Sequence, residues 1–142
     1  MTTIDVRAAR QVIRDVLLET TQETWSKDDF RWENEAESEA EFYIAEFQEL
    51  FWERSYFGMF DAAGREIFAP TARTGAGVEI VADAARTIVS AFERVYAINR
   101  QGISLSVDKA VRGSGQTVGD RYSVQVSVFW RAYAARGPLV IK

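Results

Sequence analysis

The sequence contains no cysteine and no histidine. Without cysteine, a chain forms no disulfide, offers no thiolate nucleophile and builds no zinc–thiolate site. Without histidine, it lacks the commonest general base and the commonest ligand of transition metals. These two absences favour a binding or structural role over catalysis. We therefore expect no catalytic residues, no cofactor and no metal site.

Proline, basic charge and long apolar runs are also scarce. The chain has two prolines in 142 residues, 47% hydrophobic residues and a formal net charge of −4. A nucleic-acid-binding domain usually shows a basic excess or stripe instead. No apolar run approaches the roughly 18 residues of a membrane span, and the N-terminus lacks a signal-peptide pattern. We expect one soluble domain over residues 1–142, made in the cytoplasm and large enough to bury a core.

Aromatic residues, in contrast, are abundant, at 13% of the chain. Aromatics beyond what a core needs favour interfaces, where they give large contact area at low entropic cost. Residues 25–34 mix aromatic and charged side chains without a clear period. This segment is either a loop that tucks an aromatic under a sheet edge or a partner-contact loop. The second interpretation makes Trp25, Phe30 and Trp32 contact residues.

Two segments have the apolar spacing of amphipathic helices. The first covers residues 3–20, and we expect Arg7, Arg10 and Arg14 on its water-facing side. The second covers residues 78–96, with apolar positions from Val81 to Tyr96. Its opposite face carries the polar residues Asp83, Arg86, Thr87, Ser90, Glu93 and Arg94.

The middle of the chain combines helical and strand patterns. Residues 35–53 fit a helical stripe, yet they also alternate like a strand and carry aromatic and β-branched side chains. We expect a long strand over roughly 40–52. Residues 55–60 and 65–69 are then two further strands, joined by a turn at 61–64 that ends in glycine. Pro70 should end the second of these strands.

The C-terminal third shows clear period-2 alternation. We expect a turn at 99–102, a strand from 103, a hairpin tip at 112–117 and a strand over 121–130. Residues 134–142 are a loose arm or an added edge strand. The resulting fold class is α+β, with a mostly antiparallel sheet and two helices packed on one face.

No catalytic motif stands out along the chain. The glycine loop at 71–77 precedes a helix, but it lacks the lysine and hydroxyl residue of a phosphate-binding loop. Asp28, Asp29, Glu33, Glu35 and Asp61 are candidate acids by type only, in segments that we expect to be solvated. The best enzyme interpretation is a conical α+β barrel for a small molecule, although that fold normally has two more terminal strands.

Read as an ordered pattern, residues 20–133 resemble the tail terminator proteins of siphophages, the phages with long non-contractile tails. The segment 30–34 resembles the aromatic stretch before the family's first strand, and 42–47 resembles that strand. Residues 66–70, followed by the glycine loop, resemble a strand ending in Ile/Val-Phe-x-Pro. Residues 82–92 resemble the long helix and 122–128 the closing strand. The turn at 61–64 departs from the family, which more often has one uninterrupted strand there.

The resemblance implies a structural virion protein. Such proteins form a hexameric ring that caps the tail tube, stops its polymerisation and joins it to the head connector. Their partners are further copies of themselves, the tube protein and the connector, and DNA passes through the ring without specific binding. A tail-completion or head–tail connector protein of the same neck region is the alternative within this class.

The same resemblance suggests where contacts should lie. A lumen for DNA favours acidic or neutral side chains, because basic ones hold phosphates. The lumen or ring-face candidates are Glu35, Glu37, Glu39 and Glu41. The candidates for subunit or partner contacts are Trp25, Phe30, Trp32, Arg73, Arg86, Arg94 and Arg112.

Overall fold

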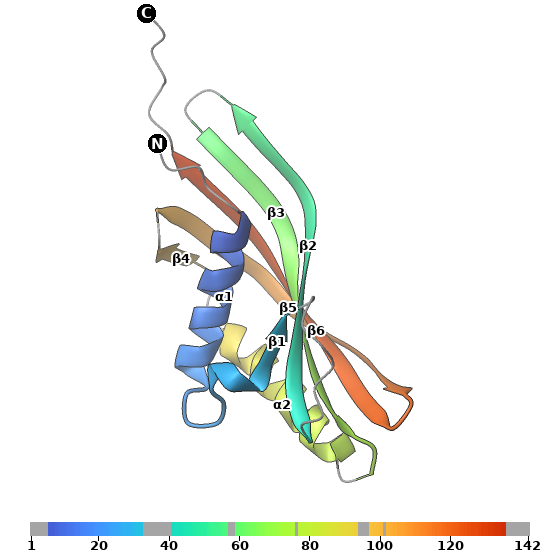
Figure 1. Cartoon of the computed structure of the whole chain (residues 1–142). Coiled ribbons are helices and arrows are strands. Elements are labelled where there is room, and N and C mark those ends of the chain that lie inside the picture. Colours follow the sequence, from blue (N-terminus) through green and yellow to red (C-terminus); the bar gives the residue numbers. More distant parts are fainter. Residues whose placement is uncertain are drawn as a thin grey trace, which may run out of the picture.

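The computed structural model describes residues 6–32, 41–56, 59–75, 77–93, 97–100 and 102–135. It contains two α-helices, one 3-10 turn and six strands (Figure 1). In chain order these are α1 (Val6–Thr20), the 3-10 helix Lys27–Asp29, β1 (Phe30–Trp32), β2 (Phe42–Tyr56), β3 (Met59–Arg73), α2 (Gly77–Phe92), β4 (Ala97–Arg100), β5 (Ile103–Val118) and β6 (Arg121–Ala135).

The six strands form one sheet in the order β1-β2-β3-β6-β5-β4. Every neighbouring pair is antiparallel except β1 and β2, which are parallel. The four long strands curl into a strongly bent sheet (Figure 1). The short strands β1 and β4 cover only part of its two edges.

Both helices lie on the same face of this sheet (Figure 1). The alternation of β6 shows why, because Val124, Val126, Val128 and Trp130 are all buried beneath them. On the helices, Val12, Leu17, Val81, Ala85 and Ile88 complete the core. The expected α+β class, with a mostly antiparallel sheet and two helices on one face, is confirmed.

Helix α1 is attached to the sheet by two buried ion pairs. Glu46 on β2 and Glu66 on β3 are both fully buried on the helix-facing side. The guanidinium of Arg14 lies 2.6 Å from Glu46, and that of Arg10 lies 3.4 Å from Glu66. Arg10 and Arg14 are one helical turn apart, so both reach the sheet from one side of the helix. The prediction that these two arginines face water was wrong.

A third ion pair connects the end of α1 to the far edge of the sheet. Arg100 on β4 donates two hydrogen bonds to the carboxylate of Glu19, at 2.7 and 2.9 Å. These bonds hold the pKa of Glu19 below its ordinary value. A carboxylate with a lowered pKa stabilises the fold above its ordinary pKa, and that contribution is lost as the pH falls through the lowered value.

The predicted helices and the long strand are confirmed in position. Helix α1 begins no later than Val6 and ends at Thr20, and α2 covers Gly77–Phe92 of the predicted 78–96. The strand expected at 40–52 is β2, which extends further, to Tyr56. The structure thereby decides between helix and strand for residues 42–53, and residues 33–40 and 94–96 lie outside the described part.

The predicted turn at 61–64 was wrong, because β3 runs through these residues without a break. β3 lies between β2 and β6 and pairs with both, so its backbone groups are used on both sides. Gly64 is needed because the ring of Trp130 lies over it. Pro70 does not end the strand either, and the ladder to β6 passes from Phe68 to Thr71 around it.

The predicted hairpin tip at 112–117 was also wrong, since β5 continues to Val118. The turn lies at Gly119 and Asp120, where Gly119 has a φ of +62° that only glycine adopts easily. A bulge between Arg112 and Gly115 absorbs the intervening residues. The turn expected at 99–102 is displaced in the same way, because Asn99 and Arg100 belong to β4.

We predict that Arg14→Leu lowers the free energy of unfolding by about 3–5 kcal/mol, because it leaves the buried Glu46 carboxylate without its cation. Urea unfolding followed by circular dichroism measures this change. The double variant Arg14→Leu/Glu46→Leu should recover most of the loss. Equal instability of the single and double variants would contradict the prediction.

We predict that Gly64→Ala costs about 1–3 kcal/mol. A Cβ at this position lies 2.5 Å from the carbonyl oxygen of Glu49 and 2.9 Å from the ring of Trp130. Gly113→Ala is the matched control, because its Cβ meets its nearest neighbour at an ordinary 3.4 Å. Thermal unfolding should separate the two variants, and equal melting temperatures would contradict the account.

Candidate interaction surface

The face of the sheet opposite the helices is not covered by any described element, and it carries large apolar side chains. We call it the open face. Trp52 is 42% exposed, Tyr133 51% and Val118 64%. Phe47, Phe51 and Val111 are exposed with them. Exposed apolar groups gathered on one face favour a protein-binding surface over a purely solvated one.

Cationic side chains lie against the aromatic rings of this face. The guanidinium of Arg54 is 4.9 Å from the centre of the Trp52 ring, and the Lys109 ammonium is 4.9 Å from that of Phe129. Phe51 packs against Phe129 at 6.0 Å between ring centres. Tryptophan, tyrosine and arginine are the residue types that dominate binding energy at protein interfaces.

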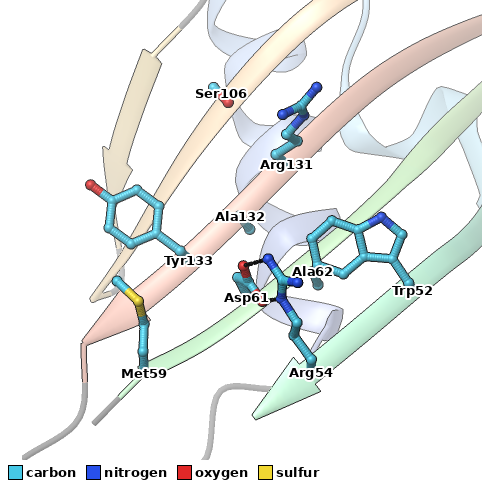
Figure 2. Close-up of a pocket in the computed structure, with 9 residues that line it drawn as sticks. All are labelled: Trp52, Arg54, Met59, Asp61, Ala62, Ser106, Arg131, Ala132 and Tyr133. Atoms are coloured by element: carbon cyan, nitrogen blue, oxygen red, sulfur yellow. Dashed lines mark hydrogen bonds and ion pairs between the residues drawn. The ribbon is translucent and has the colours of Figure 1, made fainter. Parts of the chain in front are cut away.

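The upper part of the open face contains a shallow cavity of about 360 Å³ (Figure 2). Arg54 crosses it and donates hydrogen bonds of 2.7 and 3.0 Å to the Asp61 carboxylate. Trp52 lies on one side of this pair, and Met59 and Tyr133 lie on the other (Figure 2). The walls of the cavity thus combine a paired Arg54 and Asp61 with apolar rings, a lining that is suited to binding a side chain of another protein.

A wider groove of about 880 Å³ occupies the lower part of the same face. Tyr43 and Phe47 of β2 line one side, and Val118 and Arg121 near the β5–β6 turn line the other. The guanidinium of Arg121 lies 5.7 Å from the centre of the Tyr43 ring. The cavity and the groove therefore extend the apolar surface along most of the open face.

Two of the predicted contact residues are core residues. Trp25 is 9% exposed and Phe30 is 4% exposed. Trp25 stacks on Phe42 at 6.3 Å, and Phe30 meets Phe68 edge-on at 6.3 Å. The segment tucks aromatics under the sheet edge, as one interpretation expected, but it is not a loop throughout, because Lys27–Asp29 form a 3-10 helix and Phe30–Trp32 form β1. For Trp32, the structure describes the backbone in β1 but not the side chain.

The predicted basic contact residues are exposed but not gathered in one place. Arg73 ends β3 and lies 3.6 Å from the exposed Glu41. Arg86 lies on the outer side of α2, 3.3 Å from Asp83. Arg112 is exposed on β5. Arg94, Glu35, Glu37 and Glu39 lie outside the described residues.

The sequence analysis missed Trp52, Arg54 and Tyr133. One signal was available, because Phe51 and Trp52 are adjacent in a predicted strand and neighbours point to opposite faces. At least one of them therefore had to leave the core. In the structure a bulge between Leu50 and Trp52 shifts the register there, and Phe51 and Trp52 are both exposed.

Two of the candidate acids have structural partners, and Glu33 and Glu35 lie outside the described residues. Asp29 accepts a hydrogen bond from the backbone N–H of Ser26 and caps the 3-10 turn, and Asp61 pairs with Arg54. Among the described residues, no group of three or more Asp or Glu side chains is placed to hold a metal ion. No described helix has the length and apolar character of a membrane span.

Comparison with known proteins gives the fold and no more. No protein family and no curated protein matches the sequence. One solved structure, whose name states no function, superposes with a TM-score of 0.57 at 12% identity. The match covers 91% of this chain and 98% of that one. The overall fold therefore recurs in another protein.

We predict that Trp52→Ser changes the free energy of unfolding by less than about 1 kcal/mol, because the side chain is exposed. Trp130→Leu is the control, since Trp130 is 1% exposed and its truncation should cost about 2–4 kcal/mol. Urea unfolding compares the two variants. A large loss for Trp52→Ser would make Trp52 a folding residue and remove it from the interaction surface.

Proposed function

We propose that this protein is a structural virion component of the siphophage tail terminator kind. It caps the completed tail tube as a ring, ends polymerisation and joins the tube to the head connector. Its place is the neck of the virion, after synthesis in the host cytoplasm. Its partners are its own copies, the tube protein and the connector.

The element order supports this proposal. The resemblance called for an early helix, a strand, a strand that runs uninterrupted to a Phe-x-Pro sequence, a glycine loop, a long helix and a closing strand. The sequence-based turn at 61–64 departed from that pattern, and the continuous β3 removes the departure. The glycine loop leads directly into α2, where a Cβ on Gly77 would come within 2.9 Å of Ala72.

The observation that carries the proposal is the uncovered open face. A subunit of a ring on a tube needs at least two contact regions, one for each neighbour and more for the tube and connector. The open face offers exposed aromatic, arginine and aliphatic side chains along most of a sheet built from 15- and 16-residue strands. The ion pairs on this surface keep a single, unassembled subunit soluble.

The conical-barrel enzyme or binding module has less support. It requires a deep apolar pocket, and the space between helices and sheet is filled by Phe68, Phe92, Trp130 and their neighbours. A cavity of about 170 Å³ between the end of α2 and β5 is smaller than the range of drug-sized ligand sites. A head–tail connector or tail-completion protein remains the alternative within the virion class.

Electron microscopy and solution mass test the proposal. We expect the purified protein to form a closed ring, or to form one on tubes assembled from a siphophage tail tube protein. Added before polymerisation, it should shorten those tubes. Trp52→Ser/Phe51→Ser is the matched variant, which should fold normally and lose the effect. If the protein is a monomer or dimer and leaves tube length unchanged, the proposal is wrong.

A further inference from the structure

The sheet has two free edges, and they lie on opposite sides of the subunit. β1 pairs with β2 only through Ile44, Ala45 and Glu46, so residues 47–56, which pair with β3 on one side, face no described strand on the other. β4 pairs with β5 only through residues 103–106, so residues 109–118 face no described strand on that side. A long free edge presents unpaired N–H and C=O groups that can pair with another chain.

We infer that residues 47–56 of one copy pair with residues 109–118 of a second copy, extending the sheet from subunit to subunit. The pairing is the contact between neighbours in the proposed ring and rests on that proposal. It joins two different edges, so it is heterologous, and repeating it generates a ring when the rotation closes.

The direction of the strands suits this pairing. β2, β3, β6 and β5 are successive antiparallel neighbours, so β5 runs antiparallel to β2. A second copy in the same orientation therefore places its β5 antiparallel to β2 of the first. The helices of both copies then lie on the same side of the extended sheet, and the open faces become continuous.

One register matches the two edges over their full length. With Glu53 opposite Arg112, Phe47 lies opposite Val118 and Leu50 lies opposite Gly115. Within their own subunit, each of these four residues pairs with a residue of the helix-facing side, so all four lie on the helix-facing side of the sheet. They are Leu50, Gly115, Glu53 and Arg112. The bulge after Leu50 then faces the bulge between Arg112 and Gly115, so side chains on both strands keep to the same face.

The side chains that meet in this register are complementary. Glu53 and Arg112 are exposed, and neither has an ion-pair partner in the part of the chain that the structure describes. Phe47 and Val118, at 37% and 64% exposure, form an aromatic–β-branched pair on the open face. Such cross-strand pairs are the units that stabilise a sheet.

The register also displaces neighbouring copies along the strands. Within one subunit, Phe47 and Val111 lie at the same height along the sheet, because Phe47 pairs with Ile67, Ile67 with Ser127 and Ser127 with Val111. When Phe47 lies opposite Val118 of the second copy instead, that copy is shifted along the strands by about 20 Å. Closing a sheet requires strands tilted to the axis and a fixed stagger between them. The shift is thus of the kind that a closed ring needs.

Cysteine cross-linking tests the pairing directly, because the chain has no cysteine of its own. Glu53→Cys and Arg112→Cys are purified separately, checked for folding by circular dichroism, mixed and oxidised. Opposed residues of paired strands lie within disulfide reach. We expect a disulfide-linked dimer in this mixture, well above that in the control mixture of Glu53→Cys with Lys27→Cys. Equal yields in the two mixtures overturn the pairing.

Charge reversal gives a second measurement. Arg112→Glu should raise the dissociation constant of the assembly roughly tenfold or more, since it places like charges opposite each other. Glu53→Arg/Arg112→Glu should restore assembly, because each interface regains an opposite pair. Failure of the double variant to assemble better than Arg112→Glu overturns the register. Lys27→Glu controls for net charge.

The pairing and the proposed function fail in different ways. A 53–112 cross-link in a protein that leaves tube growth unchanged supports the pairing and overturns the capping function. Tube capping by a protein whose 53–112 mixture cross-links no better than its control supports the function and overturns the pairing. Loss of the ring in Arg86→Glu, with Arg112→Glu unaffected, also overturns it and places the contact on the outer side of α2.

Discussion

Two carboxylates that are buried between helix α1 and the sheet determine where that helix lies in the folded protein. Glu46 and Glu66 lie on the side of β2 and β3 that faces α1, and both are inaccessible to solvent. A buried carboxylate is costly unless a cation and hydrogen bonds accompany it. Arg14 and Arg10 supply the cations from successive turns of α1. A helix shifted by one residue would remove both arginines from their partners, so the ion pairs fix the position of α1 more narrowly than apolar packing alone.

Fixing α1 and α2 on one face leaves the other face of the curled sheet for binding. Strand alternation supplies side chains to both faces of the sheet, so about half of the strand residues lie on the open face. Arg65 shows how that face is kept soluble in the single subunit, since it bridges to Glu49 at 2.5 Å and donates a hydrogen bond to Ser127 at 3.3 Å. Trp52 and Phe129 are likewise covered in part by cations. These cations and rings can also contact a protein partner that displaces water from the open face.

The sequence predicted both helices from their uninterrupted period, and it predicted β2 because the alternation and the aromatic and β-branched side chains of residues 40–52 favoured a strand over a helix. It failed where glycine lies inside a strand. Gly64 and Gly115 imitate turn residues, yet both are positions where an aromatic ring, Trp130 or Tyr122, lies over the backbone. Local turn chemistry cannot reveal a ring contributed from another strand. The open face was missed for a related reason, since periodicity separates two faces without saying which of them the helices cover.

The bulges give the free edges a specificity that regular edges would lack. A regular exposed edge pairs with any other strand in many registers, and bulges normally protect against this. Here both edges carry one, between Leu50 and Trp52 and between Arg112 and Gly115. A bulged strand and a regular strand cannot keep their side chains on common faces along the whole length. The β2 edge against the β5 edge can do so in the register that also opposes Glu53 and Arg112. The irregularities that discourage indiscriminate association therefore also restrict the registers in which the proposed head-to-tail contact can form.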